Sequence, residues 1–196
     1  MRRLPVYLLL DTSGSMSGEP IEAVKNGVQI MISSLRQNPQ AIETAFLSVI
    51  TFDSTAQQII PLTDLASFQM VDIKATGVTA LGEALKLVAH KIDTEVQKTT
   101  TEQKGDWKPL VFIMTDGIPT DDWQSGLNEF KKSKVAFTVA CAAGSGADAN
   151  ILKQITENVV SLDTADSASI GKFFQWVTAS IGVSSTKVED SGKEVT

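Results

Sequence analysis

Residues 4–16 read LPVYLLLDTSGSM, a nearly continuous apolar run that ends in an acidic residue and a short polar stretch. Consecutive apolar positions are typical of a strand that is buried on both faces of a parallel sheet. Pro5 is compatible with this prediction, because the start of a strand can lack a hydrogen-bond donor. We therefore predict a central strand over residues 4–10 that leads directly into a polar loop.

The remainder of the chain alternates between apolar runs and amphipathic segments. The runs predict strands over residues 45–52, 57–62, 109–114, 135–141 and 159–162, and the amphipathic segments predict helices over 19–36, 79–96, 121–132, 147–156 and 167–181. The run at 57–62 contains Pro61 and follows a turn-like stretch, so we place it antiparallel at a sheet edge. The pattern predicts a three-layer, Rossmann-like α/β fold, with a mostly parallel central sheet, one antiparallel edge strand and helices on both faces.

The length and composition are those of one globular domain. The 196 residues are 42% hydrophobic and 20% charged, which suits a folded chain with a sizeable core. Residues 184–196 are polar and show no periodicity. We therefore expect a single domain over residues 1–183 and a flexible C-terminal tail over 184–196.

The charge balance disfavours several kinds of partner. Seventeen Lys and Arg against twenty-three Asp and Glu give a net charge of -6, which repels nucleic acids and anionic membrane surfaces. The apolar run before Asp11 is far shorter than the roughly 20 residues that span a bilayer. Cys141 is the sole cysteine and cannot form an internal disulfide. We expect a cytoplasmic protein that binds neither nucleic acid nor membrane.

Two aspartates follow the two most apolar strands. Asp11 comes directly after the first strand, and Asp116 follows the strand predicted over 109–114. If these strands are neighbours, both carboxylates lie at the carboxyl edge of the sheet, where ligands bind in open parallel sheets. Two such anions repel each other unless a cation lies between them. Ser13 and Ser15 offer neutral oxygens beside them, and a hard divalent cation prefers such a set of ligands.

Three short motifs resemble one known site. DTSGS at 11–15, GVTAL at 77–81 and TDG at 115–117 resemble, in order, the three parts of the metal-ion-dependent adhesion site of von Willebrand factor A domains. The resemblance implies that this fold holds Mg2+, or Mn2+ or Ca2+, through Asp11, Ser13, Ser15, Thr79 and Asp116. It also implies an open position on the ion, which the Asp or Glu carboxylate of a protein partner fills.

Two longer stretches of the sequence resemble one subgroup of this family. DTSGSMSGEPIEA at 11–23 and MTDGIPTD at 114–121 are similar to stand-alone bacterial members of this family, above all to TerY-like proteins of tellurite-resistance and stress operons. This resemblance implies a cytoplasmic adaptor that works beside a kinase-like protein and a metal-dependent serine/threonine phosphatase.

Two of these positions have alternative interpretations. Thr79 precedes a predicted helix with Gly82 and Glu83 in its first turn, so it can serve as the helix cap as well as a metal ligand. Trp123 follows the Asp116 loop, where it can contact a partner or pack onto its own domain. Asp121 and Asp122, by contrast, fit the acidic start of a helix better than further metal ligation.

The main alternative function is a magnesium-dependent phosphotransfer enzyme or phosphatase that uses Asp11 as its nucleophile. Ser13 stands where a phosphatase with two catalytic aspartates needs its second acid, and no lysine lies near either aspartate loop. The single histidine, His90, lies in the body of a predicted helix, away from these loops. We therefore expect a binding module and not an enzyme.

Overall fold

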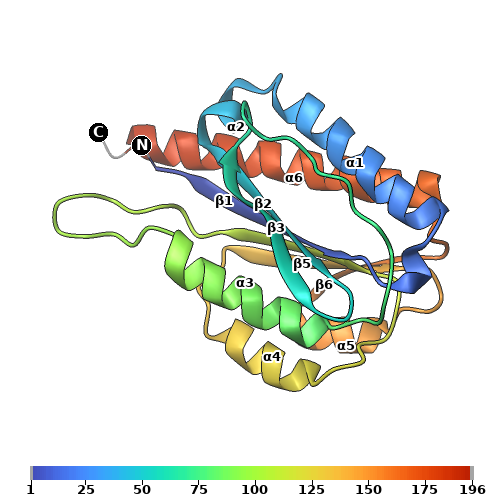
Figure 1. Ribbon diagram of the computed structural model, residues 1–196. Coiled ribbons are helices and arrows are strands. Elements are labelled where there is room, and N and C mark those ends of the chain that lie inside the picture. Colours follow the sequence, from blue (N-terminus) through green and yellow to red (C-terminus); the bar gives the residue numbers. More distant parts are fainter. Residues whose placement is uncertain (1, 195–196) are drawn as a thin grey trace.

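The computed structural model describes residues 2–194, with side chains to residue 188. Its centre is a six-stranded sheet in the order β3-β2-β1-β4-β5-β6, with helices on both faces (Figure 1). The strands are β1 (Leu4–Asp11), β2 (Ala45–Phe52), β3 (Ala56–Asp64), β4 (Leu110–Thr115), β5 (Phe137–Ala143) and β6 (Asn158–Leu162). The three-layer α/β prediction is confirmed.

The most apolar strands occupy the middle of the sheet. Every residue of β1 and β4 is buried, as their continuous apolar sequences predict. β1 pairs in parallel with β2 on one side and with β4 on the other. β3 pairs with β2 in the antiparallel sense and forms an edge, as predicted from Pro61 and the preceding turn.

The helices form two layers with separate cores. They are α1 (Glu19–Leu35), α2 (Pro39–Thr44), α3 (Leu81–Glu95), α4 (Trp123–Lys131), α5 (Ala149–Ile155) and α6 (Ser167–Glu194), with a 3-10 turn, η1 (Gly14–Met16), after β1. α1 and α6 pack together on one face of the sheet, and α3 and α4 pack together on the other (Figure 1). Their apolar faces cover the two faces of the sheet.

The C-terminal part of the chain differs from the prediction. α6 continues from Ser167 to Glu194 instead of ending at residue 181, so most of the stretch predicted as a tail over 184–196 is helical. Ser185 is fully buried, which shows that the helix still packs on the domain beyond the predicted boundary at 183. Residues 195–196 lie outside the described residues. Between residues 2 and 194, no helix is both long and apolar enough to cross a membrane.

One further helix was not predicted. α2 is six residues long, and its first backbone N–H groups are capped by the side chain of Asn38. Pro39 occupies its first turn, where a missing N–H costs no hydrogen bond. A helix of this length has too few residues to show an apolar periodicity, so pattern reading does not detect it.

Candidate metal centre

Asp11 and Asp116 meet at the carboxyl edge of the sheet because their strands are neighbours. β1 and β4 run in parallel, with Leu10 opposite Met114, so the two chains reach this edge at the same level. Asp11 is the last residue of β1 and is 0% exposed. Asp116 is the first residue after β4 and is partly exposed. The predicted convergence of the two carboxylates is thus present in the fold.

The carboxylate of Asp11 is held in place by its neighbours. Its Oδ1 accepts a 2.7 Å hydrogen bond from the backbone N–H of Ser13. Its Oδ2 accepts a 2.7 Å bond from the Thr115 hydroxyl and a 3.4 Å bond from the backbone N–H of Asp116. Asp11 therefore joins the loops after β1 and β4, and its side chain has one fixed orientation.

The two serine hydroxyls lie between the aspartates. Ser15 donates a 2.8 Å hydrogen bond to Oδ1 of Asp116, and the hydroxyl oxygens of Ser13 and Ser15 are 3.1 Å apart. Both serines belong to the loop around η1, which is anchored by the fully buried side chain of Met16. Ser13 is buried and Ser15 is exposed, so the oxygen atoms extend from the sheet to the surface.

Thr79 lies in a third loop, which is hydrogen-bonded to the other two. The backbone N–H of Gly14 donates to the carbonyl of Gly77 at 2.9 Å. Thr79 donates its N–H to the Thr120 hydroxyl at 3.1 Å and accepts the Thr120 N–H at 2.8 Å. A Cβ atom built at Gly117 would lie 3.4 Å from the Thr79 hydroxyl, so that hydroxyl faces the loop that carries Asp116.

The capping alternative for Thr79 is not what the structure shows. Ala80 is the residue that precedes α3, and it makes no side-chain cap. The first N–H groups of α3, those of Gly82 and Glu83, instead donate to the carboxylate of Asp121 at 3.0 and 2.8 Å. Asp121 thus stabilises the positive end of the α3 dipole from a neighbouring loop. The Thr79 hydroxyl is left available to a ligand.

Gly77 is required by the geometry of this loop. Its φ angle is 76°, in the left-handed region that residues with a Cβ rarely adopt. A Cβ at this position would also collide with the Ser54 side chain, whose hydroxyl accepts the N–H of Val78 at 3.3 Å. The tight turn brings Thr79 against the metal-site loops.

The site concentrates negative charge. Burial raises the pKa of Asp116, the nearby carboxylate of Asp11 raises it further, and the hydrogen bond from Ser15 opposes both effects. Burial, the larger cause, and the nearness of a second carboxylate both disfavour the charged form of Asp116. A divalent cation between the two side chains would favour that charged form.

The oxygen atoms fit a small hard cation. Two oxygens on adjacent positions of an octahedral Mg2+ lie about 2.9 Å apart when each is 2.0–2.1 Å from the ion. The Ser15 hydroxyl lies 2.8 Å from Oδ1 of Asp116 and 3.1 Å from the Ser13 hydroxyl, which are hydrogen-bond distances that are also compatible with this value. No group of three or more His, Cys, Asp or Glu side chains suited to a metal occurs in the described part of the chain. A site here depends on hydroxyl ligands beside two carboxylates.

The five predicted residues therefore lie together, and sequence reasoning missed their supports. Thr115 fixes Asp11, and Thr120 fixes Thr79. Thr115 carries a partial signal, because it ends a buried strand next to an aspartate. Trp123, the proposed partner contact, is partly buried and packs against the core under α3 and α4. Its own domain accounts for much of its contact surface.

A model of the von Willebrand factor type A domain matches residues 6–176, and the chain belongs to this family. An uncharacterized protein of Synechocystis sp. is 33% identical over 123 residues, which are 59% of this chain and 26% of the relative. A von Willebrand factor A domain-containing protein of Dictyostelium discoideum is 30% identical over 149 residues, or 74% of this chain and 15% of the relative. The chain thus spans about a quarter or less of these relatives.

A solved structure of proximal thread matrix protein 1 from the mussel byssus has the same fold. It superimposes with a TM-score of 0.70 at 20% identity, over 90% of this chain and 47% of that one. Another structure of that protein, with a TM-score of 0.66, has a zinc-occupied MIDAS motif, the metal-ion-dependent adhesion site. At this identity the likeness establishes the fold, which agrees with the family assignment.

Proposed function

We propose that the chain is a non-catalytic, metal-dependent protein-binding module. Asp11, Ser13, Ser15, Thr79 and Asp116 would hold one divalent cation, with Mg2+ as the first choice and Mn2+ or Ca2+ as alternatives. When bound, the ion supplies a positive charge that two carboxylates only partly neutralise and that attracts an outside anion. The observation that carries the proposal is the 2.8 Å contact of Ser15 with Asp116 beside the fixed carboxylate of Asp11.

The surroundings of the site favour a protein over a small free anion. Val78 is 52% exposed and adjoins Thr79, and Ile118 is 59% exposed and follows Asp116 by two residues. The two loops that carry them are joined by the hydrogen bonds between Thr79 and Thr120. Exposed aliphatic side chains at such a position suit the apolar part of a protein interface. The proposed partner presents an Asp or Glu flanked by apolar side chains.

The same geometry argues against the enzymatic alternative. Both carboxylate oxygens of Asp11 already accept hydrogen bonds, and its side chain is fully buried. A nucleophilic aspartate needs an oxygen that can approach the substrate. Within the described residues, the hydrogen bonds to the side chains of Asp11 and Asp116 come from Ser13, Ser15, Thr115 and the N–H of Asp116, and none comes from a Lys or His. The negative charge of Asp11 can attract a cation without contact with an outside substrate, so the buried carboxylate suits the proposed metal site better than nucleophilic attack.

The narrower biological setting rests on the resemblance to TerY-like proteins. We propose a cytoplasmic adaptor in a bacterial tellurite-resistance or stress-response system, with a kinase-like protein or a metal-dependent serine/threonine phosphatase as its partner. Deletion of the gene in the source cell should reduce tellurite tolerance, and wild-type protein but not Asp116→Asn should restore it. Unchanged tolerance after deletion would remove this setting and leave the binding proposal intact.

Affinity capture tests the binding proposal. The immobilised chain is incubated with a lysate of the source cell in magnesium and in chelator, and Asp116→Asn is compared with Glu43→Gln. Glu43 is exposed on α2, and its replacement by Gln removes the same unit of negative charge. We expect a defined protein that is retained in magnesium by the wild type and by Glu43→Gln and is lost in chelator and with Asp116→Asn. Equal retention by the wild type in magnesium, by the wild type in chelator and by the two variants would contradict metal-dependent binding.

A further inference from the structure

A groove of about 1410 Å3 lies at the end of the sheet opposite the metal centre. Its lining includes Leu4, Leu110 and Phe137, the first residues of the parallel strands β1, β4 and β5. Residues of α3, α4 and α6 form its sides. Leu4 and Leu110 are buried, as is Ile92 of α3, so the base of the groove is apolar. We call it the basic groove because of the charges around its rim.

The rim is positively charged although the chain as a whole is acidic. Among the residues whose side chains are described, seven Lys and Arg line the groove, against three Asp and Glu. The basic residues are Arg2, Lys86, Lys98, Lys108, Lys132, Lys134 and Lys187, and the acidic residues are Asp93, Asp106 and Glu129. Among the described side chains that line the groove, positive charge therefore exceeds negative charge, the opposite of the balance in the whole chain.

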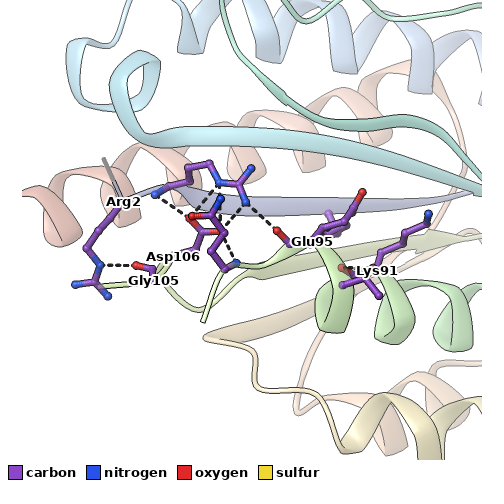
Figure 2. Close-up of polar contacts among 9 residues, drawn as sticks. Arg2, Lys91, Glu95, Gly105 and Asp106 are labelled. Carbon is purple, nitrogen blue, oxygen red and sulfur yellow. Dashed lines mark hydrogen bonds and ion pairs between the residues drawn. The ribbon is translucent and has the colours of Figure 1, made fainter. Parts of the chain in front are cut away.

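Each acidic residue of the rim forms an ion pair with a basic neighbour. Asp106 is joined to Arg3 at 2.7 Å, with a carboxylate that is 1% exposed (Figure 2). Asp93 pairs with Lys98 at 3.3 Å, and Glu129 pairs with Lys132 at 3.4 Å. Lys86, Lys108 and Lys134 are exposed and form no ion pair among the residues whose side chains are described. Their charges face solvent.

One wall of the groove is preorganised. The loop between α3 and β4, which projects beyond the sheet in Figure 1, is tied to the start of β1: Arg2 Nε donates to the Gly105 carbonyl at 2.8 Å (Figure 2). The Arg2 guanidinium lies 3.4 Å from the centre of the Trp107 ring. A Cβ at Gly105 would collide with the Gln97 carbonyl, so the loop closes tightly on itself. This wall offers a flat cationic and aromatic surface.

We propose that the basic groove binds an acidic segment of a protein partner. Exposed lysines on the rim match Asp and Glu side chains, and the buried apolar base accepts an aromatic or aliphatic side chain of the same segment. An apolar base is of little use to a phosphate backbone, and the acidic remainder of the surface repels one, so the observations favour a peptide over nucleic acid. The groove is independent of the proposed metal site, and the two lie at opposite ends of the sheet.

A binding assay with a synthetic probe tests the proposal. The probe is a fluorescent peptide of about ten residues, Asp and Glu around a central Phe, and its anisotropy is followed with the full chain in chelator. The variant Lys108→Glu/Lys134→Glu is compared with Lys74→Glu/Lys153→Glu, which makes the same change of charge at exposed lysines that do not line the groove. A second probe replaces Phe with Ser, and a third is an oligothymidylate of similar length.

We expect the acidic peptide to bind without metal and to lose about tenfold or more in affinity with the groove variant. The control variant should keep affinity within about twofold, and the Ser probe should bind more weakly than the Phe probe. Equal losses with the two variants, equal binding of the Phe and Ser probes, or tighter binding of the oligothymidylate would each overturn the proposal. Circular dichroism of both variants verifies that they are folded.

Discussion

The Ser15 hydroxyl donates a 2.8 Å hydrogen bond to Oδ1 of Asp116, a residue 101 positions further along the chain. The contact exists because β1 and β4 are neighbours whose carboxyl ends lie at the same level. It brings a neutral oxygen and a charged oxygen to the spacing of two ligands on one small ion. Burial and the nearby carboxylate of Asp11 raise the pKa of Asp116, and the hydrogen bond from Ser15 opposes them.

Thr115 supports the candidate metal site through its hydrogen bond to Asp11. Thr115→Val keeps the shape of the side chain but leaves Oδ2 of the buried Asp11 with a single 3.4 Å bond from the N–H of Asp116. We expect the free energy of unfolding to fall by about 1–3 kcal/mol, as for other buried groups that lose a partner. Urea unfolding measures it. Thr115→Ser retains the hydroxyl and should lose less; equal losses in the two variants would show that the hydrogen bond is not the cause.

The ion pair of Arg3 and Asp106 should make stability depend on pH. Burial raises the pKa of Asp106, but the hydrogen bonds from Arg3 and from the N–H of Gln97, with the charge of Arg3, outweigh it and hold the pKa below its usual range. A carboxyl with a lowered folded pKa stabilises the fold above its unfolded pKa, about 3.9, and this contribution is lost as the pH falls through the folded value.

Asp106→Asn should therefore be less stable than the wild type by about 2–3 kcal/mol at neutral pH, as expected for hydrogen bonds to a charged group. The difference should shrink below about pH 4, and urea unfolding at neutral and acidic pH measures it. Asp163→Asn, at an exposed position after β6, provides the control. A difference that stays constant with pH would contradict the charge-based explanation.

Ser185 is a buried polar residue of α6. It is 0% exposed, and its hydroxyl has no hydrogen-bond partner within the described residues. Burying such a group without a partner costs free energy, and Ala has the higher helix propensity. Ser185→Ala should raise the free energy of unfolding by about 1 kcal/mol, whereas Ser184→Ala, at a partly exposed position, should change it less. A loss of stability in Ser185→Ala would mean that the hydroxyl has a favourable role.

The central layer of the fold was predictable because its signals are local. The continuous apolar runs around Tyr7 and Phe112 predict buried parallel strands, and Pro61 places its strand at an edge. The end of α6 was not predictable from periodicity, since the helix buries Ser185 in place of an apolar residue. α2 was missed because six residues are too short for a pattern.

The charged residues of the candidate site were also predictable from the sequence. Asp11 and Asp116 follow apolar strands, so the rule that ligands bind at strand ends selects them. Thr115 and Thr120 were not selected as supports, because their partners, Asp11 and Thr79, lie 104 and 41 residues away along the chain. Asp11 is fully buried, and its replacement by Ala would leave the N–H of Ser13 and the hydroxyl of Thr115 without their acceptor.

Asp116→Asn is accordingly the better probe of the metal centre, because Asp116 is partly exposed and the change preserves its shape. Isothermal titration calorimetry with Mg2+ tests the central claim most directly, using the full chain, Asp116→Asn and the charge-matched Glu43→Gln. We expect one ion per chain for the wild type and for Glu43→Gln, and a loss of affinity of about tenfold or more for Asp116→Asn. Absence of binding to the wild type, or equal affinity of Asp116→Asn, would contradict the assignment of this site.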